Sequence, residues 1–182
     1  EHPPAQIANE EVLARIAAIK AAAEPLRSTF NDGDDGDGGW DTESDDEVQR
    51  SYGPGVYHIR VDADNTVAWG SGPDAAADFY AEVDAYHVEG PQDNEFGILF
   101  RNDGDNYFVF NVSSDGYFRL HKWLNGEWES VVDWAESSAI VTGEGSHNRL
   151  GVLAEGPEIS ILVNDQVLAT VTDDTINGDG LA

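Results

Sequence analysis

Three runs of alternating apolar and polar residues follow one another between residues 107 and 134, YFVFNVSSDGYFRLHKWLNGEWESVVDW. Alternation with a period of two predicts strands that have one buried and one exposed face. Asp115-Gly116 and Asn125-Gly126 separate the runs, and both dipeptides accept the positive φ angles of tight hairpins. The stretch therefore predicts an antiparallel β-meander. Its core-facing side chains would be Phe108, Phe110, Phe118 and Leu120.

The same pattern continues on both sides of the meander. A second hairpin is predicted at residues 158–173, EISILVNDQVLATVTD, where Asn164-Asp165 separates two runs of alternating residues. From Tyr52 onward, further short runs recur with Gly, Pro, Asn or Asp at nearly every junction. This density of strands and turns predicts an all-β domain over residues 52–182, folded as an antiparallel β-sandwich or jelly roll.

Residues 1–27 follow a helical pattern instead. Apolar residues recur at spacings of four and three, at Val12, Ile16, Ile19, Ala23 and Leu26. This spacing predicts an amphipathic helix from about Asn9, which can cap it, to Glu24, with Pro25 ending it. One helix of this length is only marginally stable by itself. Its apolar seam is therefore expected to pack on the β-domain, on a partner protein or on copies of itself.

Residues 28–51 are expected to form a first strand and an acidic loop rich in Asp and Gly. The run from 31 to 47 contains nine acids and no base. Hard oxygen ligands at short spacing suit Ca²⁺, so a calcium site is one hypothesis, although no register has the full calcium-loop pattern. The alternative is a solvated, flexible loop. The candidate ligands are Asp32, Asp34, Asp35 and Asp37.

The charge of the chain excludes several classes of function. With 36 acidic residues against 9 basic ones, the formal net charge is −27, which argues against nucleic acid as a partner. There is no cysteine and no apolar run long enough for membrane insertion. An acid-rich surface with only two lysines is typical of extracellular or cell-surface proteins in saline or calcium-rich surroundings. Simple solubility through charge is the alternative.

From about Phe30 to its end, the chain resembles the concanavalin A-like lectin and glucanase jelly-roll domains. In particular it resembles the laminin-G-like and 3-keto-disaccharide-hydrolase-like group of bacterial extracytoplasmic proteins. The matching segments occur in the expected order over about 85% of the chain: GVYHIRV, DFYAEVDA, FGILFRNDGDNYFVFNVSSDGYFRLHKWLNGEW and NRLGVLAEGPEISILVNDQVLATVTD. The resemblance implies the jelly-roll fold, which hosts lectins, hydrolases and inert spacers.

The same resemblance raises a question about the sheet edge. In that group a closing strand normally follows the segment that corresponds to Gly180-Leu181-Ala182. We therefore expect either that such a strand lies beyond the given residues or that another segment, such as one from a neighbouring subunit, covers an open edge.

Glu82 and Asp84 resemble the Glu-x-Asp core of laminarinase-type glucanases. In those enzymes a further Glu completes the catalytic pair, but Ala85, Tyr86 and His87 follow here, so the second carboxylate is missing. The alternative is a solvated strand face on which the two acids pair with Arg101 or Arg119. The five histidines show no metal-ligand spacing, and Ser113-Ser114 and Ser137-Ser138 are interpreted as turn residues.

If alternation holds throughout, the face that carries Glu82 and Asp84 also carries a mixed set of aromatic and polar side chains. Aromatic faces stack on the C–H patches of sugars while planar polar groups bond to hydroxyls, so this set is the preferred ligand site. The alternative is that the tryptophans fill the core or the sheet edges. The predicted ligand-binding residues are Tyr86, Arg101, Asn111, Tyr117, Arg119, His121 and Trp123.

Three functional hypotheses follow. The leading one is a secreted or surface-displayed, non-enzymatic module that binds glycan, or takes part in adhesion or extracellular assembly, with calcium as a candidate stabiliser. The second is a structural subunit of a surface layer or filament, which would use the helix and the open edge for homo-oligomeric contacts. The third is a glycosidase-like enzyme that acts through Glu82 and Asp84.

Overall fold

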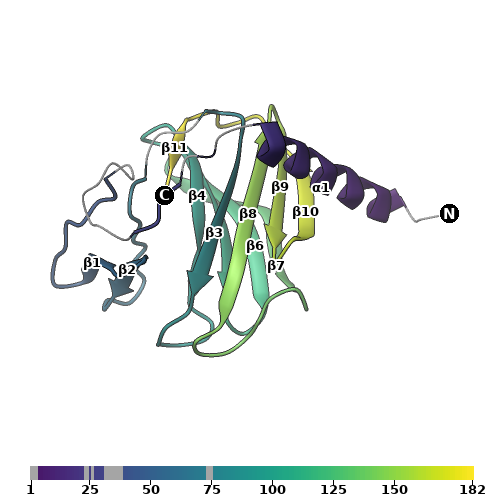
Figure 1. The fold of residues 1–182 in the computed structure, drawn as a ribbon. Helices are drawn as coiled ribbons and strands as arrows, with labels where there is room; N and C mark the ends of the chain where they lie inside the picture. Colours follow the sequence, from purple (N-terminus) through teal and green to yellow (C-terminus); the bar gives the residue numbers. More distant parts are fainter. Residues whose placement is uncertain (1–3, 23–24, 26, 31–38, 73–75) are drawn as a thin grey trace.

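Two antiparallel sheets packed face to face form the body of the protein (Figure 1). The computed structural model describes residues 4–22, 25, 27–30, 39–72 and 76–182. One sheet has the strand order β10-β9-β8-β3, and the other has the order β11-β4-β5-β6-β7. The four-stranded sheet comprises β3 (Phe79–Tyr86), β8 (His147–Glu155), β9 (Glu158–Val163) and β10 (Gln166–Thr172). The five-stranded sheet comprises β4 (Glu95–Asn102), β5 (Tyr107–Ser113), β6 (Tyr117–Leu124), β7 (Glu127–Glu136) and β11 (Gly180–Leu181).

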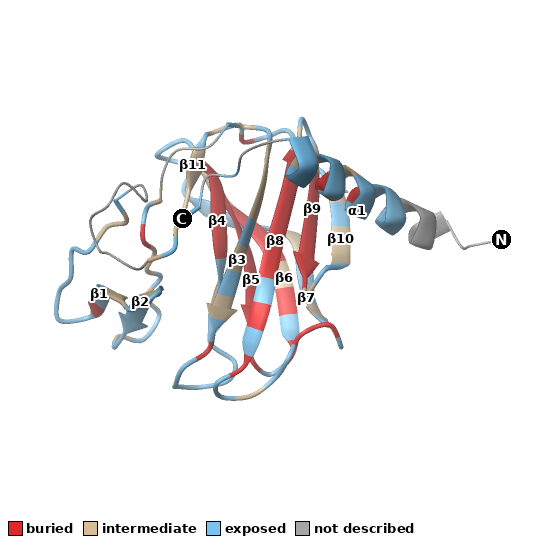
Figure 2. Ribbon diagram, in the orientation of Figure 1, coloured by how far each residue is buried: buried red, intermediate tan, exposed pale blue. Residues whose placement is uncertain are grey.

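The core lies between the sheets, where Figure 2 shows the buried residues of both layers. Alternation along each strand places every second side chain there. Phe108, Phe110, Phe118 and Leu120 are all buried in this core, as the meander predicted. The facing layer is aliphatic and supplies Leu150, Val152, Ile159, Ile161 and Val163.

The predicted hairpins are confirmed. Asn125 and Gly126 have φ angles of 54° and 87°, and Asn164 and Asp165 have φ angles of 49° and 62°. Positive φ at both central residues is the geometry of the tight turn that matches strand twist. The turns join β6 to β7 and β9 to β10, so these two hairpins form where the sequence placed them. Asp115-Gly116 also joins paired strands, β5 and β6, but there only Gly116 has a positive φ, of 104°.

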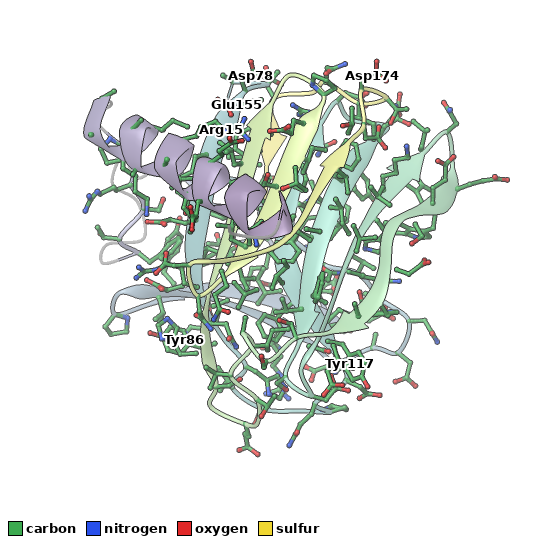
Figure 3. The ribbon with its side chains drawn as sticks, turned by 90° about the vertical axis from the view of Figure 1, so that its right-hand side faces the viewer. Arg15, Asp78, Tyr86, Tyr117, Glu155 and Asp174 are labelled. Carbon is green, nitrogen blue, oxygen red and sulfur yellow. The ribbon has the colours of Figure 1, made fainter. Side chains whose placement is uncertain are left out.

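Helix α1 (Pro4–Ala22) packs across the outer face of the four-stranded sheet (Figures 1 and 3). Val12 and Ile16 are buried against Leu153 and Leu162, with Ile19 partly buried beside them. Of the three expected partners for the apolar seam, the β-domain is therefore the one it contacts. The helix begins at Pro4 rather than near Asn9, because proline is well suited to the first turn of a helix. It is not a membrane span, because no described helix combines the required length and apolarity.

Strands β1 (Val48–Gly53) and β2 (Val56–Val61) pair only with each other and project beside the sandwich (Figure 1). Rings from Phe30, Trp40, Tyr52 and Tyr57 cluster at this hairpin, with centroids 5.4 to 6.3 Å apart. The sheets of the sandwich thus begin at β3, whereas the sequence placed the start of the sandwich at residue 52. Residues 48–51 of the predicted segment 28–51 belong to β1 of this separate hairpin, and no strand in the described part of that segment joins the sandwich.

The C-terminal residues occupy the edge beside β4. Gly180 and Leu181 form β11, and the backbone N–H of Leu99 donates to the Ala182 carbonyl at 2.7 Å. On the other side, the N–H of Gly72 donates to the Leu181 carbonyl at 3.0 Å. Gly180, Leu181 and Ala182 therefore pair along the end of β4 from Leu99 to Asn102.

Candidate functional site

The residues predicted to share one ligand-binding face are divided between two faces. Glu82, Asp84 and Tyr86 lie on the outer face of the four-stranded sheet, because β3 pairs with β8 and not with β4. Asn111, Arg119, His121, Tyr117 and Trp123 lie on the outer face of the five-stranded sheet, on β5 and β6. In Figure 3, Tyr86 and Tyr117 lie on opposite sides of the sandwich. The single face expected from alternation is therefore wrong.

Arg101 belongs to neither outer face. Its φ angle of 53° interrupts the alternation of β4, and its side chain is 0% exposed. Its Nη2 donates to the Gly156 carbonyl at 2.5 Å and its Nε donates to the Ala77 carbonyl at 3.2 Å. Burial lowers the pKa of the guanidinium, and Asp78 at 3.9 Å opposes this effect. Arg101 thus links β4 to the segment before β3 and to the β8–β9 turn. The prediction that Arg101 lies on an outward, ligand-binding face is therefore wrong.

A connected polar network lies at the centre of the five-stranded face. Glu95 accepts hydrogen bonds from Arg119, with Nε at 2.9 Å and Nη2 at 2.7 Å. The same carboxylate accepts from Asn111 Nδ2 at 2.5 Å, and that amide also lies 3.3 Å from His121 Nε2. A two-pronged contact between Arg and a carboxylate fixes both side chains in orientation. Three adjacent strands therefore hold these four groups in a preorganised arrangement.

Exposed aromatic rings flank the network. The indole of Trp128 stacks on the His121 ring with centroids 4.3 Å apart and an interplanar angle of 13°. The Arg119 guanidinium lies 4.9 Å from the centroid of the Trp134 ring. Trp128 is 43% exposed and Trp134 is 40% exposed, so neither is a core filler. Trp123 packs edge-on against Trp128 at 5.2 Å and extends the aromatic surface.

Two adjoining hollows open on this face. One, of about 250 Å³, is lined by Arg119, His121, Trp128, Glu129, Ser130, Asp133 and Trp134. The other, of about 350 Å³, is lined by Asp93, Glu95, Ser113, Asp115, Tyr117 and Trp134. We call the two together the β5–β7 face. Because Trp134 is a wall of both hollows, they form one continuous surface.

The β5–β7 face brings together some of the predicted site residues and adds residues that the sequence did not single out. Tyr117, Arg119 and His121 line the hollows as the alternation of β6 suggests. Glu95, Trp128 and Trp134 were not predicted as site residues. The sequence could have indicated Trp128, because a two-residue turn at Asn125-Gly126 places Trp128 opposite Trp123 in the adjacent strand. No comparable pattern marked Glu95.

His121 is neutral near pH 7. Burial lowers its pKa to about 4, and the nearby Arg119 charge adds to this shift. The Asn111 amide approaches Nε2, which can accept its hydrogen only while that nitrogen is unprotonated. The face therefore presents a neutral imidazole.

Glu82 is held beside the helix rather than in a catalytic arrangement. Its carboxylate accepts hydrogen bonds from Lys20 Nζ at 2.7 Å and from Tyr80 Oη at 2.8 Å. Burial would raise the pKa of Glu82, but these two hydrogen bonds outweigh it and the net effect lowers the pKa. A general acid requires a raised pKa, so these surroundings do not suit Glu82 to the acid role in glycoside hydrolysis.

Asp84 is held by Arg149 and His147. Arg149 Nε donates to it at 3.1 Å, and His147 Nε2 lies 2.9 Å from the same oxygen. The hydrogen bond from Arg149 lowers the pKa of this carboxyl, and burial only partly opposes it. The prediction that Arg101 or Arg119 pairs with Glu82 and Asp84 is wrong. Arg101 lies on β4 and Arg119 lies on β6, and both strands belong to the other sheet. The glycosidase hypothesis gains no support from this geometry.

The calcium hypothesis concerns residues that lie outside the described part of the chain. Asp32, Asp34, Asp35 and Asp37 fall within the range 31–38, which the structure does not describe. Among the residues that it does describe, no group of three or more His, Asp or Glu side chains is arranged to hold a metal ion.

No protein-family model matches the chain, and no curated protein sequence matches it significantly. The carbohydrate binding module CBM66 from Bacillus subtilis has a similar structure, with a TM-score of 0.52 and 20% identity over 79% of this chain and 82% of that chain. Sheep galectin-11, in a complex with glycerol, gives a TM-score of 0.48 and 16% identity over 61% and 83% of the two chains. The Caenorhabditis elegans galectin LEC-6 gives a TM-score of 0.42 and 19% identity over 59% of this chain and 82% of that chain. The chain thus has the jelly-roll β-sandwich fold of the concanavalin A-like type, as the sequence predicted.

Proposed function

We propose that the protein is a glycan-binding module and that the β5–β7 face is its binding site. The proposal rests on one observation: exposed tryptophans lie directly beside a fixed network of planar polar groups. Trp128 and Trp134 offer rings to the C–H faces of a sugar, while Arg119 and His121 lie beside them. Sugar recognition requires this combination of stacking surfaces and oriented hydrogen-bonding groups.

The fold is compatible with this role, since a carbohydrate binding module shares it. The opposite face is a weaker candidate, because α1 covers part of it and its carboxylates are already paired with Lys20 and Arg149. We further propose an extracellular location, as the acid-rich, lysine-poor composition favours.

A glycan array with purified protein, run with and without EDTA, tests the proposal. We expect retention of at least one class of glycan, and a loss of about tenfold or more in affinity for Trp134→Ala, because the ring forms a wall of both hollows. Arg119→Ala should weaken binding similarly, since it removes a donor and frees Glu95. Retention that disappears with EDTA would add support for the calcium hypothesis.

Tyr86→Ala is the matched control. Tyr86 is an exposed aromatic residue, 56% accessible, on the opposite face of the sandwich, where it stacks on His147. Its replacement should leave glycan affinity unchanged. Absence of any retained glycan from a broad panel, or equal losses for Tyr86→Ala and Trp134→Ala, would count against the β5–β7 face as a glycan site.

A further inference from the structure

The side chains that line the β5–β7 face are strongly unbalanced in charge. Five acidic residues line the two hollows: Asp93, Glu95, Asp115, Glu129 and Asp133. Arg119 is the one permanent cation in the lining. A ligand that enters either hollow is therefore surrounded mainly by negative charge.

The charge of Arg119 is already matched by Glu95. Two guanidinium nitrogens donate to that carboxylate, at 2.7 and 2.9 Å, which leaves Arg119 with hydrogen-bonding capacity but little free positive charge. His121 adds no compensation, because its ring is neutral near pH 7. Four acidic residues of the lining thus stand beyond this pair.

The nearest buried cation does not change this balance. Lys122 Nζ lies 3.5 Å from Glu129 but 2.8 Å from Asp173, and it also donates to Thr175 at 3.0 Å. Its side chain is 8% exposed and points into the sandwich, away from the hollows. Asp173 therefore takes most of its charge. Glu129 lies opposite Lys122 in the register of β6 and β7, so its carboxylate turns to the same side as Lys122 and adds negative charge beside the hollow rather than inside it.

We infer that the β5–β7 face takes uncharged oligosaccharides and excludes sugars that carry carboxylate or sulfate groups, an inference that rests on the proposed glycan-binding function. Hydroxyl groups can donate to the carboxylates of the lining, whereas an anionic group would meet like charges in a partly desolvated hollow. Since Trp134 joins the two hollows, linked sugars can lie across it and use both.

The test compares each neutral oligosaccharide that the protein retains with the same oligosaccharide oxidised to the acid at C6. At about 0.1 M salt we expect the oxidised form to bind at least about tenfold more weakly, and at about 1 M NaCl the difference should shrink because charges are screened over shorter distances. The quadruple variant Asp93→Asn, Asp115→Asn, Glu129→Gln, Asp133→Asn should also reduce the difference.

The matched control removes as many charges from exposed acids that line neither hollow: Asp64→Asn, Asp105→Asn, Glu144→Gln and Asp174→Asn. It should keep the wild-type discrimination. Equal binding of neutral and oxidised forms, or a preference for the acid, overturns the inference while the glycan-binding function stands. Binding of no glycan at all removes both. If the quadruple variant does not fold, the salt dependence of the wild-type difference decides alone, and discrimination that is unchanged at 1 M NaCl overturns the inference.

Discussion

At the residue scale, His121 links the stability of the β5–β7 face to pH. Its pKa is lowered to about 4 in the folded state by burial, against about 6.5 in an unfolded chain. The unfolded state therefore binds a proton first as pH falls, so the stability present above pH 6.5 is lost progressively toward pH 4. We expect this residue alone to remove about 1 to 2 kcal/mol of stability between pH 6.5 and 5.

The measurement is urea unfolding at several pH values, for the wild type and for His121→Gln. The difference in stability between the two proteins should change over this window by the amount that the histidine contributes. A parallel slope in both proteins would contradict the assignment. NMR titration of the His121 ring gives a direct check, since the ring should stay unprotonated down to about pH 4.

The hydrophobic pattern predicted the orientation of some single residues correctly and of others wrongly. Alternation placed Arg119 and His121 on an outer face correctly, because β6 is regular at those positions. Alternation along β4 assigns Arg101 to the outer face as well, yet its positive φ turns the side chain inward. A non-glycine residue in this region is uncommon, and no neighbouring glycine or proline signals it. The buried hydrogen bonds to Ala77 and Gly156 come from segments distant in the sequence.

At the element scale, the docking of α1 depends on its apolar seam. The helix would be marginal alone, so contacts of Val12 and Ile16 with the sheet supply most of its stability. The ion pairs of Arg15 with Glu155 and of Lys20 with Glu82 are largely exposed and contribute less, up to about 1 kcal/mol each. Ile16→Ala should therefore weaken docking by about 2 kcal/mol or more.

Hydrogen exchange of the α1 amides measures this effect, because it reports local opening separately from global unfolding. We expect protection of α1 to fall by about tenfold or more in Ile16→Ala, while the strands of the five-stranded sheet stay protected. Leu13→Ala is the matched control, since Leu13 lies on the same helix but is 38% exposed. Unchanged α1 protection in Ile16→Ala would show that the seam does not hold the helix.

Turn chemistry predicted the hairpins well, but it did not predict the register across β6 and β7. Starting from Asn125-Gly126, regular pairing places Trp123 opposite Trp128, as observed. Further along, register shifts on either side of Leu120 leave Tyr117 opposite Glu136. Continuation from that pair brings Trp134 beside Arg119, where the cation–π contact forms. Bulges of this kind leave no reliable mark on a hydrophobic pattern, so the site could be assembled only from the structure.

At the scale of the whole molecule, the sequence indicated where strands form better than which sheet each strand joins. Sequential strands β4 to β7 pair in order, and the meander predicted this for β5, β6 and β7. Strand β3, however, pairs with β8, more than sixty residues later. Periodicity carries no information about such distant pairing, and for that reason Glu82 and Tyr86 were expected on the same face as Arg119.

The overall charge acts on the molecule as a whole. With a formal net charge of −27 on 182 residues, repulsion among surface carboxylates opposes the compact state. Raising NaCl from about 0.1 to 1 M shortens the screening length from about 10 to 3 Å. We expect the Tm to rise by at least about 4 °C, which corresponds to about 1 kcal/mol or more for a chain of this length. An unchanged or lower Tm at high salt would contradict this expectation.

Divalent cations separate general screening from a specific calcium site. At equal ionic strength, CaCl₂ and MgCl₂ screen surface charge alike, but Ca²⁺ accepts the irregular oxygen cages that Mg²⁺ does not. If the acidic run binds calcium, CaCl₂ should raise the Tm beyond MgCl₂, and replacing Asp32, Asp34, Asp35 and Asp37 by Asn should abolish only that additional rise. The control variant loses the same number of charges at four acids elsewhere in the chain: Asp64, Asp105, Glu144 and Asp174. Equal effects of the two cations on the wild type would leave screening as the sole contribution and reject the calcium site.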